Sequence, residues 1–249
     1  MERRSFLKRS GLAFGAAAMA GGAARAASII EERQTRPFDP TDWGSVRAQF
    51  DLLDPTLAYF AGFYLVSHPI PVRAALDRYR AALDLNPVGY HHEHGQEFED
   101  RVRAAAGQYL GVDGLKEIAL TDSTTMGLAI LYTGLKLRPD QEILSTTHDH
   151  PAATQMSLRL RGLRTGTKIV TIPMYADSAK ASVDEMVGSI VRGITPKTRV
   201  LALTWVHSCT GVKIPVRAIA DAVAGLNKQR DEKDRVIFCL DGVHGLGID

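Results

Sequence analysis

The sequence predicts an α/β fold, with a mostly parallel sheet flanked by helices. Between residues 117 and 240, short apolar runs of strand length alternate with helical patterns of ten or so residues. The last run, Val236–Leu240, favours a central strand buried on both faces, and Asp241-Gly follows it directly. We therefore expect a carboxylate at the sheet edge where α/β folds bind ligands, although an isolated Asp-Gly is more often a turn.

The composition suits one large α/β domain or slightly more. The chain has 249 residues, of which 45% are hydrophobic, enough to bury a full core. Its formal net charge of +2 comes from the amino terminus, because 25 basic and 27 acidic residues remain when residues 1–26 are removed. The remainder gives no reason to expect a nucleic-acid partner.

The amino terminus is similar to an export signal. Paired arginines in Arg3-Arg4-Ser5-Phe6-Leu7-Lys8 precede a Gly/Ala-rich apolar run, and Ala24-Arg25-Ala26 offers small residues for cleavage. This pattern resembles the twin-arginine signal of bacteria. We predict a signal peptide over residues 1–26, the twin-arginine translocation machinery as a partner, and a periplasmic or exported protein. A basic tail before an amphipathic helix is the weaker alternative, since the run has no polar face.

Before residue 117 the sequence predicts an irregular segment, an aromatic-rich stretch and two helices. Residues 27–56 are expected to be a linker or amino-terminal arm, and residues 57–249 the main domain. The aromatic-rich stretch Leu57–Leu65 is compatible with a strand or a loop. Apolar residues at helical spacing predict helices over 71–83 and 97–110.

Between these two helices, Tyr90-His-His-Glu-His94 suggests metal ligands. Adjacent residues cannot all converge on one ion, and no second cluster stands at ligand spacing. We therefore expect a polar loop near a pocket and no metal site, with a metal as the minor alternative.

The remaining elements alternate regularly. The predicted strands are 117–121, 142–145, 168–172, 199–204 and 236–240. The predicted helices are 125–135, 152–163, 183–192 and 216–229. The alternation implies parallel pairing with right-handed crossovers. Because Cys209 and Cys239 both stand in apolar strand contexts, we expect buried thiols in preference to a disulfide or metal site.

Polar side chains follow several of the predicted strands. Thr121-Asp-Ser-Thr-Thr125 precedes a helix whose first N–H groups and dipole could bind a phosphate, although Ser and Thr are equally ordinary caps. His150 follows the second strand, where an imidazole could stack on a planar ring or move a proton. His207-Ser208 follows the fourth strand and Asp241 the fifth. A phosphorylated, planar, basic heteroaromatic ring would use all these groups, and pyridoxal 5'-phosphate fits.

Motifs in this order resemble the class V aminotransferase family of fold-type I pyridoxal-phosphate enzymes. They are Thr121–Ala129, Asp149–Ala152, His207–Pro215 and Asp241–His244. The resemblance spans about Leu57 to Asp249 and favours the isopenicillin N epimerase-like branch, with cysteine desulfurases as more distant relatives. It implies a homodimeric transferase or isomerase that withdraws the α-proton of an amino acid through an external aldimine.

The resemblance also implies particular roles. It places Thr124 and Thr125 on the cofactor phosphate and stacks His150 over the ring. It pairs Asp241 with the pyridine nitrogen, which keeps that nitrogen protonated. His150 and Asp241 are therefore the expected catalytic residues.

Two further positions complete the expected cofactor site. Ser208 and His244 fall near the phenolic oxygen, where relatives often have Asn and Gln. These residue types depart from the desulfurase pattern.

The family's Schiff-base lysine lies a couple of dozen residues beyond the aspartate, in a Ser/Thr-x-His-Lys setting. The sequence ends at Asp249, before that position. We therefore expect a fragment, inactive alone, that stops before the small carboxyl-terminal domain. The alternatives are a desulfurase or lyase-type member, a non-catalytic protein that binds the cofactor or another phospho-ligand, and an unrelated α/β domain whose strand-end groups are caps and turns.

Overall fold

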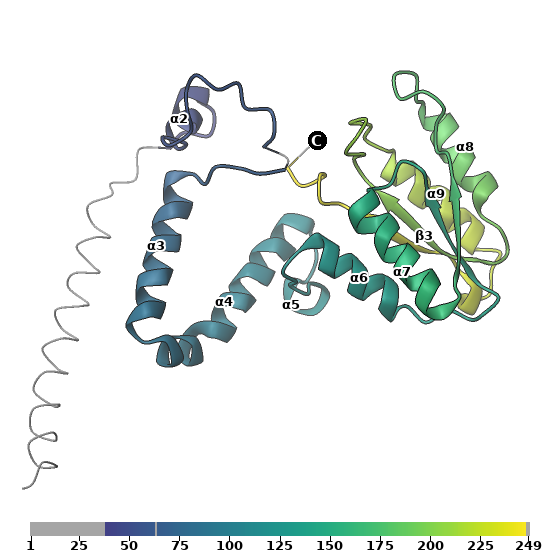
Figure 1. The fold of residues 1–249 in the computed structure, drawn as a ribbon, viewed down its shortest axis with the longest axis horizontal. Coiled ribbons are helices and arrows are strands. Elements are labelled where there is room, and N and C mark those ends of the chain that lie inside the picture. The colour runs from purple at the N-terminus through teal and green to yellow at the C-terminus, as the bar shows by residue number, and fades with distance from the viewer. Residues whose placement is uncertain (1–37, 63, 248–249) are drawn as a thin grey trace, which may run out of the picture. The chain divides into compact units, whose positions relative to one another are not determined.

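The computed structural model describes residues 38–62 and 64–247. The chain divides into two compact units between Ala119 and Leu120, and each is described separately (Figure 1). The predicted signal peptide, residues 1–26, lies outside the described residues.

The unit that ends at Ala119 is helical. Its helices are α2 (Trp43–Ala48), α3 (Ile70–Leu85), α4 (Pro87–Leu110) and α5 (Gly114–Glu117). Asn86 separates α3 from α4 and caps α4, because its side-chain oxygen accepts the Gly89 N–H at 3.2 Å. The described residues of Leu57–Leu65 form neither helix nor strand.

The expected polar loop at Tyr90–His94 is wrong, because these residues belong to α4. The Asn86 cap starts a new helix before them, and Tyr90, His94 and Phe98 then recur every four residues. Their rings pack along one side, with centroids 4.8 Å apart for Tyr90 and His94 and 5.5 Å for His94 and Phe98. Among the described residues, no group of three or more His, Cys, Asp or Glu could hold a metal ion.

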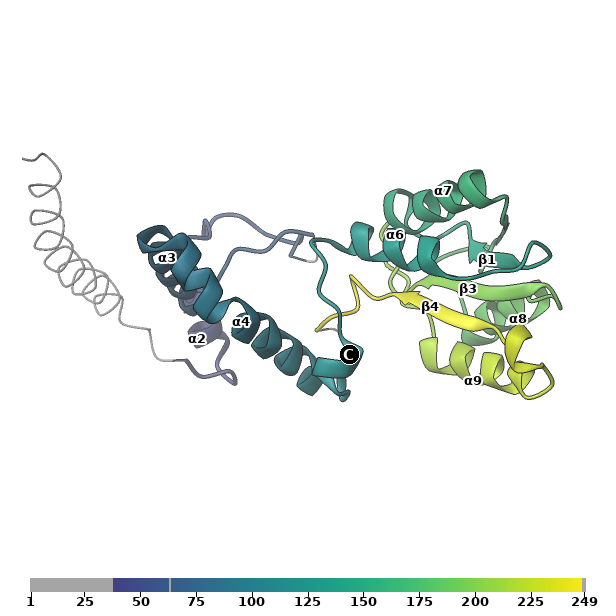
Figure 2. The ribbon, with the colours of Figure 1, turned by 90° about the horizontal axis from the view of Figure 1, so that it is seen from below.

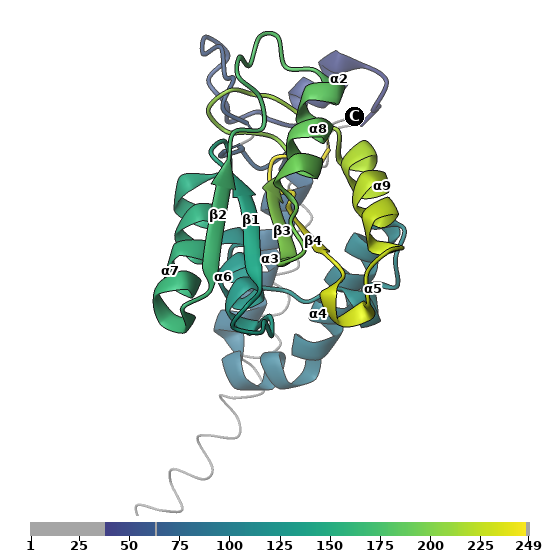
Figure 3. The same ribbon diagram turned by 90° about the vertical axis from the view of Figure 1, so that its right-hand side faces the viewer.

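The unit that begins at Leu120 contains a four-stranded parallel sheet of order β2-β1-β3-β4 (Figure 3). The strands are β1 (Glu142–Thr146), β2 (Lys168–Ile172), β3 (Thr198–Thr204) and β4 (Ile237–Asp241). Every neighbouring pair is parallel. The predicted α/β fold class and parallel pairing are confirmed.

Helices cover both faces of this sheet. They are α6 (Thr124–Gly134), α7 (Met156–Thr165), α8 (Val183–Gly193) and α9 (Val216–Asn227), with a π-helical turn η1 (Pro151–Gln155) before α7 and a 3-10 turn η2 (Glu232–Asp234) before β4. Figure 2 shows α6 and α7 on one face and α8 and α9 on the other. Side-chain alternation serves both layers, since Ile143 joins the core under α6 and α7 and Leu144 the core under α8 and α9.

The expected strand at 117–121 is wrong. Glu117 ends α5, and residues 118–121 have no regular structure. A strand needs a neighbour for its backbone groups, and no described strand pairs with this segment. Instead the Arg103 side chain donates to the Ile118 carbonyl at 2.9 Å.

Two expectations about burial also need correction. β4 lies at an edge of the described sheet and its Ile237, Phe238 and Leu240 are only half-buried, because β3 alone pairs with it. Cys239 is a buried free thiol as expected, but Cys209 is exposed, since β3 ends at Thr204 and Cys209 stands in the following loop. No described helix is long and apolar enough to cross a membrane.

Candidate functional site

The carboxyl ends of β1, β3 and β4 form the site. Thr204 ends β3 and stands in register with Asp241, the last residue of β4. The Asp241 carbonyl accepts the Trp205 N–H at 2.8 Å, which extends the pairing into the following loop. Parallel pairing therefore places the residues after these strands at one edge of the sheet.

Asp241 is a buried carboxylate held from two sides. Asp241 is 2% exposed. The Thr154 hydroxyl donates to Oδ2 at 3.2 Å, and the Val243 N–H donates to Oδ1 at 3.2 Å. Because two carboxylate oxygens can accept about four hydrogen bonds, Asp241 retains the capacity to accept one from a ligand.

His150 caps the π-helical turn that follows β1. Its Nδ1 accepts the Ala153 N–H at 3.1 Å, so the neutral ring carries its proton on Nε2. The backbone N–H of His150 donates to the Thr204 hydroxyl at 3.2 Å. The half-buried imidazole is thus fixed in position and tautomer. π-helical turns are often found at functional sites.

Thr124 and Thr125 begin α6 and are exposed. Ser123 is the cap, and its hydroxyl accepts the Met126 N–H at 3.1 Å. Since the first N–H groups of a helix have no acceptor within it, this end of α6 favours an anion. α6 packs against η1, the turn that His150 caps, so the helix predicted to bind the phosphate and His150 belong to neighbouring elements.

Ser208 and His244 meet across two loops. The Ser208 hydroxyl lies 3.1 Å from Nε2 of His244. Gly245 permits the approach of these loops, because a Cβ there would stand 1.9 Å from the Trp205 ring. Ser208, His244 and Asp241 therefore belong to one edge of the sheet, as the sequence predicts.

Asp149 is a functional candidate that sequence reasoning did not single out. It is 1% exposed, and its carboxylate accepts from the Ser145 hydroxyl, from the Thr146 hydroxyl and N–H, and from the Thr204 N–H, at 2.5 to 2.9 Å. Burial raises the Asp149 pKa, and the bonds from Thr146, Ser145 and Thr204 oppose that effect. The carboxylate ties β1 to β3 immediately before His150.

A second cluster lies beside the site. The His148 ring stacks on Tyr175, with centroids 3.9 Å apart. The Tyr175 hydroxyl lies 2.9 Å from Nδ1 of His207 and 2.8 Å from the Thr210 hydroxyl. His207 is 1% exposed, and its Nε2 is without a hydrogen-bond partner among the described residues. These contacts hold the loop that carries Ser208.

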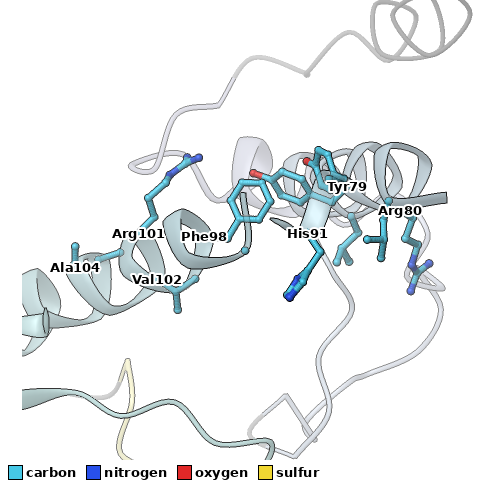
Figure 4. A pocket seen from close by; sticks show the side chains of 12 residues that line it. Tyr79, Arg80, His91, Phe98, Arg101, Val102 and Ala104 are labelled. Carbon is cyan, nitrogen blue, oxygen red and sulfur yellow. The ribbon is translucent and has the colours of Figure 1, made fainter. Parts of the chain in front are cut away.

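A cavity of about 790 Å³ lies between α3 and α4 in the other unit (Figure 4). Apolar and aromatic side chains such as Tyr79, Phe98 and Val102 line it, together with Arg80 and Arg101. None of the predicted site residues does so.

The strand-end carboxylate, the imidazole and the helix terminus form a candidate ligand site at the carboxyl edge of the sheet of this α/β protein. The chain belongs to the aminotransferase class-V family, whose model matches residues 67–247.

Relatives with known structures share the fold. The chain is similar to a mutant of C-DES with glycine covalently linked to its PLP cofactor, at 23% identity and a TM-score of 0.71, over 81% of this chain and 50% of that one. It is also similar to the apo cysteine desulfurase from Thermococcus onnurineus NA1, at 15% identity and a TM-score of 0.59, over 82% of this chain and 48% of that one.

A curated relative is the aminotransferase-like protein FGM3 of Gibberella zeae. It is 29% identical over 124 residues, which are 50% of this chain and 30% of that protein. The chain therefore spans about half or less of the length of the relatives it matches.

Proposed function

We propose that this chain forms the cofactor-binding part of a pyridoxal 5'-phosphate-dependent enzyme that acts on an amino acid. The observation that carries the proposal is Asp241, a buried carboxylate held by two donors at the ligand edge of the sheet. Membership of the aminotransferase class-V family supports it. So does the likeness to C-DES, whose structure contains the PLP cofactor.

The residues at the site fit this cofactor. The amino-terminal end of α6 is exposed and suits a phosphate. Asp241 has acceptor capacity for a protonated ring nitrogen, and His150 presents a half-buried ring of fixed tautomer. The only carboxylate among the proposed site residues, Asp241, is assigned to the protonated ring nitrogen, and none is assigned to the phosphate.

Each residue then has a distinct task. Bound pyridoxal phosphate supplies an electron sink for negative charge at the α-carbon of the substrate. Asp241 holds the proton on the ring nitrogen, and His150 orients the ring by stacking on it. Thr124 and Thr125 present N–H and hydroxyl donors to the phosphate.

Ser208 and His244 bind the phenolic oxygen in this proposal. The Ser208 hydroxyl has a single proton, so it donates either to His244 or to the ligand oxygen. His244 then donates or accepts at Nε2 accordingly.

We further propose the isopenicillin N epimerase-like branch of the family for this chain. The support is the Ser208 and His244 pair, whose residue types depart from the desulfurase pattern. Release of sulfur from cysteine by the enzyme, without exchange of the α-hydrogen of other amino acids in D₂O, would contradict this branch.

Titration of the purified full chain with pyridoxal phosphate tests the main proposal. Trp205 packs against Gly245 beside Asp241, so its fluorescence reports binding. We expect saturable binding that weakens about tenfold or more in Asp241→Ala, because a hydrogen bond to a charged group is lost. Asp221→Ala, which removes a carboxylate bonded to Arg217 on α9, is the control and should bind as the wild type does. No binding, or equal binding by Asp241→Ala, would contradict the proposal.

A further inference from the structure

We propose that Thr154 is a positioning residue for Asp241, held in turn by Thr204 and His150. The inference rests on the proposed function, since it concerns how the carboxylate meets the ring nitrogen. Thr154 lies in η1 and is fully buried, although a threonine hydroxyl is costly to bury without partners. Its Oγ1 donates to Asp241 Oδ2 at 3.2 Å.

The direction of the hydrogen bonds follows from the donors available. The backbone N–H of His150 can only donate, so the Thr204 hydroxyl accepts a hydrogen bond from it at 3.2 Å. The Thr204 proton then points to the Thr154 hydroxyl, 3.5 Å away, and the Thr154 proton points to Asp241. Each hydrogen bond in this series is therefore donated in the same direction, from the backbone of His150 toward the Asp241 carboxylate.

Thr204, through which this series passes, is held in place by Asp149. Thr204 is fully buried at the end of β3, and its N–H donates to Asp149 Oδ1 at 2.5 Å. Asp149 also accepts from three donors at the end of β1. The hydroxyl of Thr204 is thereby held between two strands, and it sets the position of Thr154.

The consequence concerns the geometry of Asp241. Val243 N–H engages Oδ1 and Thr154 engages Oδ2, so both oxygens are held and the carboxylate plane cannot rotate freely. The same series joins this carboxylate to the backbone N–H of His150, so Asp241 and His150 share one support.

The test compares Thr154→Val, which keeps the shape and removes the hydroxyl, with Thr154→Ser, which restores it. Thr133→Val on α6, whose hydroxyl bonds only to carbonyls of its own helix, is the matched control. The full chain of each variant is titrated with pyridoxal phosphate labelled with ¹⁵N in the ring. The dissociation constant, the ¹⁵N chemical shift of the bound ring and the melting temperature are measured.

We expect Thr154→Val to bind about tenfold more weakly and its ¹⁵N shift to move toward that of an unprotonated pyridine. Thr154→Ser should restore both, and Thr133→Val should change neither. Thr154→Ala replaces the valine variant if the latter does not fold. A wild-type ¹⁵N shift in Thr154→Val, or a failure of Thr154→Ser to restore it, overturns the inference alone. Failure of the wild type to bind overturns the proposed function and this inference with it.

Discussion

Asp149 and Asp241 are both buried carboxylates, and their hydrogen bonds separate their tasks. Asp149 accepts from the Ser145 hydroxyl, from both donors of Thr146 and from the Thr204 N–H, so its acceptor capacity is used within the protein. Asp241 accepts from two and keeps capacity for a ligand. The first therefore holds the site together, and the second is available to bind.

His207 predicts a loss of stability in acid. Burial, with a smaller effect of His148, lowers the His207 pKa from 6.5 to about 4. The unfolded chain therefore takes up this proton at a higher pH than the folded chain. The contribution of the neutral His207 ring to the free energy of unfolding is complete above about pH 6.5 and is lost as the pH falls toward 4.

The free energy of urea unfolding at pH 7 and pH 4.5 checks this prediction. His207→Asn keeps a side-chain acceptor near Tyr175 without a titrating ring, and it should lose roughly 2 kcal/mol less than the wild type across this range. The raised pKa of Asp149 acts in the opposite direction, but it does so in both proteins and cancels in the comparison. Equal losses would contradict the prediction.

At the scale of elements, a buried arginine supports the helix that begins at Thr124. Arg161 of α7 is 4% exposed and donates from Nη1 to the carbonyls of Tyr132 and Leu135 at 2.6 Å. These carbonyls stand at the carboxyl end of α6, where no N–H group of the helix can donate to them. The cation also suits the negative end of the α6 dipole.

Replacing Arg161 with leucine should therefore destabilise the unit that contains the sheet. We expect a loss of about 2–4 kcal/mol, because buried carbonyls lose a charged donor. Arg159→Leu is the control, since Arg159 is exposed on the same helix. Urea unfolding followed by circular dichroism measures the difference, and equal stability of the two variants would show that Arg161 does not support α6.

At the scale of the whole molecule, the amino terminus carries a prediction of its own. If residues 1–26 are a twin-arginine signal, Arg3→Lys together with Arg4→Lys should abolish export in a bacterial host, because the pathway reads the arginine pair. The full chain is followed by immunoblotting of periplasmic and cytoplasmic fractions. Arg9→Lys, outside the pair, should be exported normally. Export of the double variant at the wild-type level would contradict the assignment.

The periodicity of the sequence determined the strands from β1 to β4, the helices between them and the parallel pairing, while the strand order came from the structure. Apolar runs of strand length need cover on both faces, and intervening helices allow only crossover connections. The same local patterns placed Asp241, His150 and Ser208 after strands. Where a segment lacked a neighbour, as at residues 117–121, strand-like composition was not enough.

Only the tertiary structure decided which polar groups meet. Thr154 and Asp241 are 87 residues apart in the chain, and their hydrogen bond exists because η1 lies over the ends of β3 and β4. Nothing in the residues around Thr154 marks it, since threonine in a helical segment has no pattern of its own. The tautomer of His150 likewise depends on the hydrogen bond that its Nδ1 accepts from the Ala153 N–H in the π-helical turn. Hydrogen-bond partners are set by distance in space, which local periodicity does not encode.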